Sequence, residues 1–237
     1  MTDTLVQIIL KETNYHQNPY FVALKNGEFS KEDFIETQIQ FYWAVIFFSR
    51  PMAVLAAKIP EPKLRLEILR NVWEEHGEGD ISKMHGNTFK TLLSRLGNVQ
   101  EKDMQTRALW PEIRSFNENL IAACTLDHYL VGCGAMGIIE RMFVDISFWI
   151  GSTITDRGWL TKEQMIHYNL HEELDIKHSK DFFDVLDTTW NQDIKNQYRI
   201  EQGLRLGAYI FNTLYRSLYE SRKRRLLINP NESPEVM

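Results

Sequence analysis

The segment HEELDIKH, residues 171–178, places two imidazoles and a carboxylate at spacings of four and three residues. In a helix, His171, Asp175 and His178 would lie within about 60° of one another, on one face. Three side chains that can bind a metal ion would then share a stripe roughly two turns long. The same mixture also occurs on ordinary polar helix surfaces, so a metal site needs matching ligands from other segments.

A second candidate ligand, Glu140, lies in an apolar segment. The residues three and four positions away from it are Met136, Gly137, Phe143 and Val144. A carboxylate on such a face must be paired, protonated or bound to a cation, because burying it bare is costly. A salt bridge to another helix would satisfy it, but beside the histidine stripe a metal ion is the favoured partner.

The third contribution is expected from NVWEEHGEGDISKMHGNTF, residues 71–89. On a continuous helix Glu74 and His85, eleven residues apart, point within about 20° of the same direction. Glu75 misses His85 by about 80°. Glu78, seven residues before His85, also shares its face and is the rival to Glu74.

The predicted ligands are three carboxylates and three imidazoles from three helices: Glu74, His85, Glu140, His171, Asp175 and His178. Carboxylates with imidazoles and no cysteine suit iron or manganese better than structural zinc. Six ligands are too many for one catalytic ion but suit two ions bridged by a carboxylate. Diiron sites inside helical bundles are built in this way.

Helical periodicity dominates the elements that must position these ligands. The helical segments run over about 3–14, 19–26, 31–58, 61–96, 100–107, 110–124, 127–156, 161–187 and 190–227. The two glycines of HGEGD weaken the fourth segment. We therefore expect an all-α fold, a bundle of seven or eight helices in a single domain over residues 1–228. The polar tail, residues 229–237, is expected to be disordered.

Composition and charge exclude several classes of protein. A net charge of −5 gives no electrostatic footprint for nucleic acid, and RKRR at 222–225 is expected to complement a helix C-terminus. Two cysteines, Cys124 and Cys133, cannot form a disulfide framework, which indicates a reducing compartment. No signal peptide is evident, and three charges within the apolar segment 129–151 argue against a membrane helix. A soluble cytoplasmic protein without membrane or nucleic-acid partners is predicted.

These motifs resemble those of the heme-oxygenase-like diiron oxidases and oxygenases, relatives of the PQQ-synthesis protein C and thiaminase II folds. The resemblance covers roughly residues 5–225 and is carried by EEHGEGDISKMH, by GIIE ending at Glu140, and by HEELDIKH. In the last motif the family pattern is His-x-x-x-Asp/Glu-x-x-His. The resemblance implies a heme-oxygenase-like bundle, the same six ligands, two Fe(II) ions, and O2 as co-substrate.

The resemblance also implies the reaction class. Family members oxidise amine nitrogens or cleave carbon–carbon bonds of fatty acids and amino acids. We expect a non-heme diiron oxygenase that forms a homodimer and whose small-molecule substrate is an amino acid. The most specific expectation is conversion of a brominated tryptophan to an indole-3-carbonitrile, a nitrile synthase reaction of natural-product biosynthesis. Arg50, Arg141 or Arg157 would then bind the substrate carboxylate.

Three alternatives stay open. One is a diiron N-oxygenase, or an oxidase that cleaves carbon–carbon bonds, on the same fold. Another is a metal-free, thiaminase-like enzyme with Cys133 as its nucleophile, and the third is a non-enzymatic helical binding module. Members that build aminobenzoate from their own tyrosine and lysine are a poorer match, because those positions correspond to Phe21 and Ile150 here.

Overall fold

The computed structural model describes residues 2–228, apart from the side chains of residues 166 and 169–174. Ten α-helices and four short 3-10 turns make up this part of the chain, so the all-α prediction is confirmed. The helices are α1 (Thr2–Thr13), α2 (Pro19–Asn26), α3 (Lys31–Lys58), α4 (Pro62–Glu75), α5 (His85–Gly97), α6 (Glu101–Thr106), α7 (Pro111–Thr125), α8 (Tyr129–Asp156), α9 (Ile166–Trp190) and α10 (Ile194–Ser221). The predicted tail, residues 229–237, lies outside the described residues.

Several helices begin and end where local chemistry predicts. The Ser30 side chain accepts a hydrogen bond from the backbone N–H of Asp33 and caps α3. Gly27 ends α2 in the left-handed conformation, with φ of 83°. The capping box of Thr161 and Gln164 forms as well, but it starts a 3-10 turn, and α9 begins two residues later.

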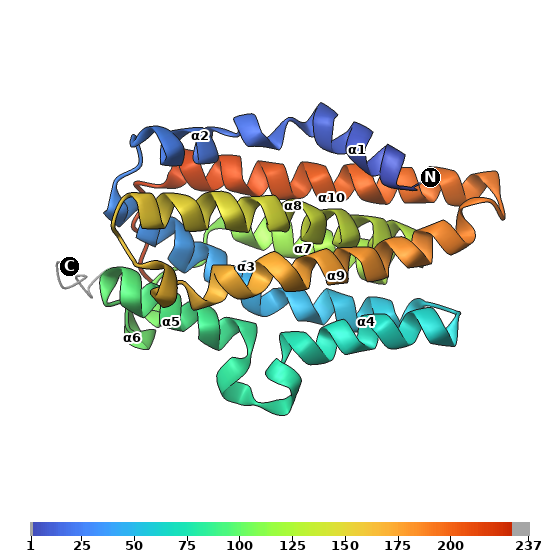
Figure 1. Ribbon diagram of the computed structural model, residues 1–237, viewed down its shortest axis with the longest axis horizontal. Coiled ribbons are helices and arrows are strands. Elements are labelled where there is room, and N and C mark those ends of the chain that lie inside the picture. Colours follow the sequence, from blue (N-terminus) through green and yellow to red (C-terminus); the bar gives the residue numbers. More distant parts are fainter. Residues whose placement is uncertain (1, 229–237) are drawn as a thin grey trace.

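The long helices α3, α7, α8, α9 and α10 run along the length of the bundle, with α4 and α5 following one another along one side (Figure 1). Helix α8 packs most extensively against α9 and α10. Its approach to α10 is close, because a Cβ atom on Gly203 or Gly207 would clash with the backbone of Val131 or Ala135. Gly203 and Gly207 therefore permit the close approach of α10 to α8.

Helix α3 is long and apolar enough to cross a membrane by length and composition alone. Half of that apolar window is buried inside the bundle. Its buried residues Phe34, Ile39 and Met52 belong to the hydrophobic core. This helix thus forms one wall of the interior.

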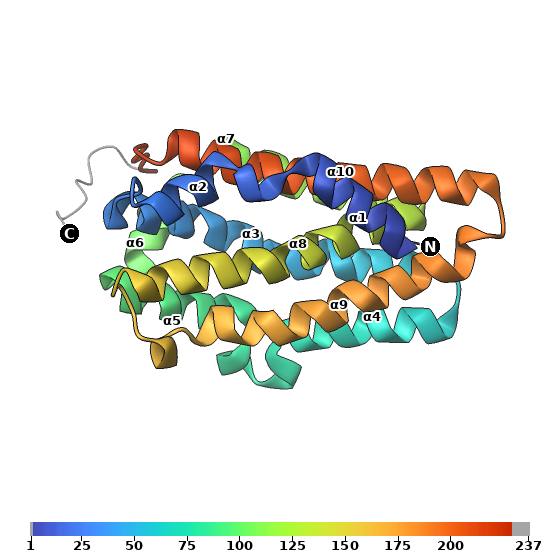
Figure 2. The ribbon, with the colours of Figure 1, turned by 45° about the horizontal axis from the view of Figure 1, so that its top comes forward.

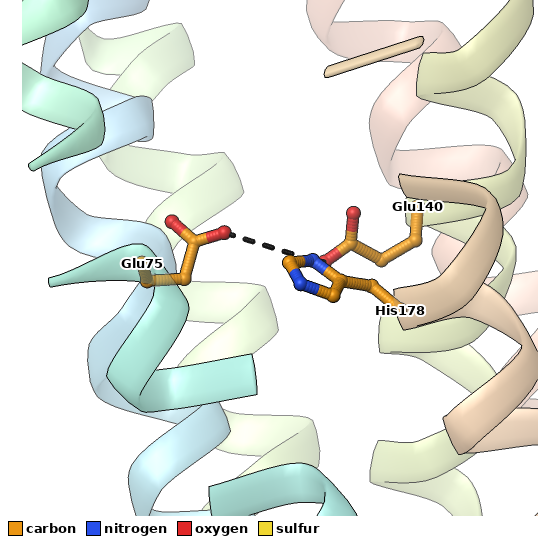
Figure 3. A group of neighbouring side chains, drawn as sticks. All are labelled: Glu75, Glu140 and His178. Carbon is orange, nitrogen blue, oxygen red and sulfur yellow. Dashed lines mark ion pairs between the residues drawn. The ribbon is translucent and has the colours of Figure 1, made fainter. Parts of the chain in front are cut away.

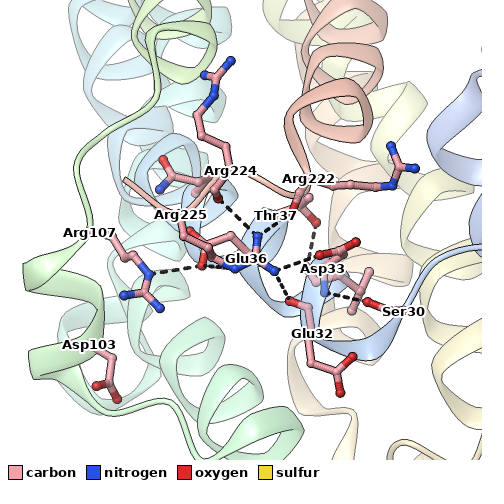
Figure 4. A network of polar contacts seen from close by, with 12 residues as sticks. Ser30, Glu32, Asp33, Glu36, Thr37, Asp103, Arg107, Arg222, Arg224 and Arg225 are labelled. Atoms are coloured by element: carbon pink, nitrogen blue, oxygen red, sulfur yellow. Dashed lines mark hydrogen bonds and ion pairs between the residues drawn. The ribbon is translucent and has the colours of Figure 1, made fainter. Parts of the chain in front are cut away.

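The basic cluster at the end of α10 is bound within the molecule (Figure 4). Arg222 donates to the carbonyl of Tyr219 at 2.8 Å, as expected for a cation at a helix C-terminus. Arg224 pairs with Glu112 of α7 at 2.9 Å. Arg225 pairs with Asp33 at the start of α3 at 2.8 Å. The cluster therefore joins the end of α10 to α3 and α7.

Candidate metal centre

The segment between α4 and α5 decides which acid faces the interior. Helix α4 ends at Glu75, and α5 begins only at His85. Between them, Gly77, Glu78 and Gly79 have φ values of 67°, 54° and 89°, in the left-handed region that glycine favours. The expectation of one helix over 61–96 is therefore wrong, and with it the angular argument that joined Glu74 to His85. This turn projects from the bundle in both views (Figures 1 and 2).

The turn brings Glu75, not Glu74, against His85. The Nδ1 atom of His85 lies 2.7 Å from Oε2 of Glu75, and both side chains are almost fully buried. The rival acid, Glu78, lies exposed in the turn. The glycine pair was the available sequence signal, because a break there removes the helical spacing on which the choice of Glu74 depended.

Glu75, Glu140 and His178 form a buried cluster from α4, α8 and α9 (Figure 3). Each offers one ligand atom, and these atoms lie within 4.8 Å of one another. The Nδ1 atom of His178 is 3.7 Å from Oε1 of Glu140 and 3.9 Å from Oε1 of Glu75. Ligands about 2 Å from a shared ion lie roughly 3 to 4 Å apart, so the spacing suits a metal ion.

Two buried atoms of the cluster indicate whether the site can hold a cation. In the part of the chain that the structure describes, Oε1 of Glu140 and Nδ1 of His178 are buried and have no hydrogen-bond partner. Buried polar atoms are nearly always partnered, by protein, water or ion. A cation bound between the two atoms would satisfy both, so the donor set fits a metal ion.

The pKa values reflect how closely these groups are packed. Burial raises the pKa of Glu140 to about 7. Burial alone would lower the pKa of His178, but the neighbouring carboxylates of Glu140, Glu75 and Glu74 raise it to about 10. Burial likewise opposes a charged His85, but the charges of Glu75 and Asp175 raise its pKa.

The remaining predicted ligands divide into three cases. Asp175 is fully buried, and its charge acts on both His85 and Glu140, so it lies with the cluster. The side chain of His171 lies outside the described part of the chain. Glu74 is in contact with His178, but on the side away from the cluster.

Glu74 contacts the ring nitrogen of His178 that points away from the cluster. Its Oε2 lies 2.8 Å from Nε2 of His178, and its Oε1 binds Lys177. The other ring nitrogen, Nδ1, is the atom that faces Glu75 and Glu140. A carboxylate that binds the far nitrogen of a ligating histidine fixes the ring and its tautomer. The geometry therefore gives Glu74 an orienting position.

His167 was missed by the sequence reasoning. It is fully buried on α9, its Nδ1 lies 3.0 Å from the hydroxyl of Thr88, and its ring centroid is 6.4 Å from that of His85. The signal was available, because His167 lies four residues before His171 and so shares its helix face.

A cavity of about 50 Å³ adjoins the cluster. It lies among α3, α7, α8 and α10 on one side and the acids and histidines on the other. Its lining residues are Phe41, Ala44, Val45, Phe48, Glu75, His85, Phe116, Ile139, Glu140, Phe143, His167 and Phe211. Ligand-binding sites of enzymes are often cavities of this kind, apolar with a few convergent polar groups.

A bundle that gathers carboxylates and imidazoles beside an apolar cavity defines a helical protein with a candidate metal centre. The chain belongs to the family of iron-containing redox enzymes, whose family model matches residues 36–210. It is also similar to a 4-aminobenzoate synthase of Nitrosomonas europaea, with 25% identity over 190 residues that cover 74% of each chain.

Solved structures support the fold. A domain of Shewanella denitrificans with a heme oxygenase-like fold has a TM-score of 0.73 at 13% identity, covering 93% of this chain and 89% of that one. A TenA homologue from P. horikoshii OT3 has a TM-score of 0.72 at 13% identity, covering 93% and 99%. At such identities the likeness shows the fold alone, and the predicted heme-oxygenase-like bundle is confirmed.

Proposed function

We propose that this chain is a non-heme diiron enzyme that uses O2 to oxidise a small organic substrate. The observation that carries the proposal is the buried convergence of Glu75, Glu140 and His178 beside an apolar cavity. Membership of the iron-containing redox enzymes supports the choice of metal. Bound iron would supply the electrons for reduction of O2.

The proposed ligand set differs from the predicted set at one position, where Glu75 takes the place of Glu74. Its members are His85, Glu75, Glu140, Asp175, His178 and, from its place in the sequence motif, His171. The protein's own contribution is to hold these groups apart from water. Glu74 orients His178, and the aromatic cavity walls exclude solvent from the inner side of the cluster.

The test is anaerobic loading of the purified protein with Fe(II), followed by exposure to air-saturated buffer. We expect about two irons per chain, and O2 consumption that depends on them. Glu75→Gln should reduce both, because the amide is a much weaker ligand. A protein that binds no iron, or consumes O2 equally without it, would rule the proposal out.

The specific reaction proposed is conversion of a brominated tryptophan to an indole-3-carbonitrile. The cavity's five phenylalanines support it, since aromatic walls suit an indole ring. N-oxygenation, or carbon–carbon cleavage of a fatty acid or amino acid, would use the same centre. A screen of such substrates for iron-dependent O2 uptake, with products identified by mass spectrometry, distinguishes them. The cytoplasmic location and the homodimer stay predictions.

Two other reactions find less support. A thiaminase-like reaction needs a reactive Cys133, but this thiol is fully buried and burial raises its pKa well above the ordinary value. Cys133 also does not belong to the cavity lining. For aminobenzoate formation, the resemblance matches the contributing tyrosine and lysine to Phe21 and Ile150, which are both buried and carry neither a hydroxyl nor an amine.

A further inference from the structure

The cavity beside the cluster has two chemically distinct ends. Eight of its twelve lining residues are apolar: Phe41, Ala44, Val45, Phe48, Phe116, Ile139, Phe143 and Phe211. The other four, at the cluster end, are acids and histidines: Glu75, His85, Glu140 and His167. A substrate that enters therefore meets hydrocarbon on most sides and carboxylates at one end.

No lysine or arginine lines the described walls of this cavity. The side chains of residues 166 and 169–174 add none, since the sequence there has only Ile, Asn, Leu, His and Glu. An amino-acid carboxylate inside the cavity would thus meet no lysine or arginine, only two histidines, of which His85 already pairs with Glu75 and His167 already contacts Thr88.

The three arginines expected to bind a substrate carboxylate are engaged elsewhere. Arg141 pairs with Asp145 at 3.2 Å, on the same helix. Arg157 donates to the carbonyl of Phe29 at 2.6 Å. Arg50 is exposed and lies over the ring of Phe47. None of them belongs to the cavity lining.

The walls of the cavity differ in burial, and this difference determines which side chains can move to admit a ligand. Its inner wall is buried and aromatic, with the ring centroids of Phe116 and Phe143 lying 5.8 Å and 6.1 Å from that of Phe211. Val45 and Phe48, by contrast, are only half-buried. At about 50 Å³ the cavity is smaller than the roughly 150 Å³ that accommodates a benzene molecule. A ring must therefore displace the half-buried side chains as it enters.

From these observations we propose that the part of the substrate that occupies this cavity is uncharged and apolar, an aromatic ring or an alkyl group. A carboxylate attached to it is tolerated only when iron offsets the charges of Glu75 and Glu140. A bare anion there would lose its hydration and lie beside two acids with no lysine or arginine to pair with, so its binding is disfavoured. The statement about the carboxylate rests on the proposed function, whereas the statement about the apolar group does not.

The experiment compares indole with indole-3-propionate by isothermal titration calorimetry, on the iron-free protein and on the anaerobic Fe(II)-loaded protein. We expect indole to bind at one site with a dissociation constant below about 1 mM in both forms. Indole-3-propionate should bind the iron-free form at least tenfold more weakly than indole. Equal binding of the two ligands to the iron-free form would overturn the proposal, as would failure of indole to bind.

Two variants test whether the ligand binds in this cavity. Ala44→Leu places three more carbon atoms in it and should weaken indole binding about tenfold or more. Phe116→Ala enlarges it and should tighten indole binding about tenfold. Damage to the fold would weaken binding in both variants, so opposite signs are the signature of the cavity. No change in either variant would place the ligand elsewhere and overturn the proposal.

The outcomes for the cavity and for the proposed function are separable. Indole binding to the iron-free protein requires no metal chemistry. If the chain takes up iron and consumes O2 but does not bind indole, the cavity inference falls and the diiron proposal stands. If indole binds but the chain takes up no iron, the cavity inference stands and the diiron proposal falls.

Discussion

Glu74 and Glu75 are neighbouring acids with different partners. Glu75 contacts His85 and faces the cluster, whereas Glu74 contacts Lys177 and the outer nitrogen of His178. Glu75→Gln should therefore abolish tight binding of about one iron per chain. Glu74→Gln should keep the stoichiometry but weaken affinity about 10- to 100-fold, because only the orientation of His178 is loosened.

Anaerobic iron titrations in competition with a chelator measure both quantities, and the two variants control for each other. They differ by one position and remove the same charge. The opposite pattern, with stoichiometry lost in Glu74→Gln and kept in Glu75→Gln, would restore Glu74 as the ligand.

Cys133 offers a second prediction at the scale of single residues. Since Cys133 is fully buried on α8 and lies outside the cavity lining, Cys133→Ala should leave the rate of iron-dependent O2 consumption within about twofold of the parent. Steady-state oxygen-electrode assays measure this rate. Loss of turnover together with retained iron binding would point to the thiol as a reactant and revive the thiaminase-like alternative.

Single residues also show what sequence reasoning can reach. Glu140 was predictable because a lone acid within an apolar helix needs a partner, and it is buried in the cluster. Asp175 and His178 were predictable from spacing alone, since α9 is continuous through both. Glu75 was not predictable, because helical angles cannot be extended across a turn in which Gly77, Glu78 and Gly79 adopt left-handed conformations.

At the scale of elements, the turn between α4 and α5 sets the distance from Glu75 to His85. Gly77 has φ of 67°, and a Cβ atom there would lie 2.7 Å from the backbone nitrogen of Met84. Gly77→Ala should therefore shift the start of α5, displace His85 and lower both the melting temperature and the affinity for iron. Differential scanning fluorimetry and iron titration measure the two effects.

Gly158 provides the matched control for this turn. Its φ is 65°, but a Cβ atom there has nothing within 4 Å. Gly158→Ala should cost only the backbone strain, about 1 kcal/mol, and leave iron affinity unchanged. Equal loss of iron affinity in the two variants would mean that general destabilisation, and not the position of His85, controls metal binding.

The elements differ in how well the sequence predicts them. Helices α3, α7 and α8 begin and end within about two residues of expectation, because Ser30, Pro111 and the apolar run of α8 are strong local signals. The described residues form ten α-helices where seven or eight were expected, and the expected helix over 61–96 divides into α4 and α5 where two glycines and Glu78 interrupt the pattern. The glycines signal such a break, but helical periodicity does not report the direction in which the chain leaves it.

At the scale of the whole molecule, a buried ion pair and the cluster of Glu75, Glu140 and His178 join distant parts of the chain at separate places. Glu36 of α3 pairs with Arg107 at 3.1 Å, both almost fully buried, and Arg225 after α10 lies 3.5 Å from the same carboxylate (Figure 4). Removing one partner of a buried pair leaves an uncompensated charge. Arg107→Met should thus destabilise the fold by about 3 kcal/mol, measured by urea unfolding. A change below about 1 kcal/mol would show that Arg225 alone neutralises Glu36.

Iron should stabilise the whole fold because its ligands come from helices far apart in the sequence. Glu75, Glu140 and His178 lie on α4, α8 and α9, so an ion bound by all three holds these helices together. At an iron concentration of 100 times the dissociation constant, binding adds about 2.7 kcal/mol. For a chain of this size that corresponds to a rise of roughly 5 to 10 °C in melting temperature.

Two variants separate this effect from ordinary stability when melting is followed by circular dichroism under nitrogen, with and without Fe(II). Glu140→Gln should remove most of the iron-dependent rise, since it replaces a carboxylate ligand by an amide. Arg225→Gln should lower the melting temperature equally in both states, because Arg225 pairs with Asp33 and Glu36 and distant sites contribute additively. If iron raises the melting temperature of Glu140→Gln as much as that of the parent, the ion is bound somewhere other than between α4, α8 and α9.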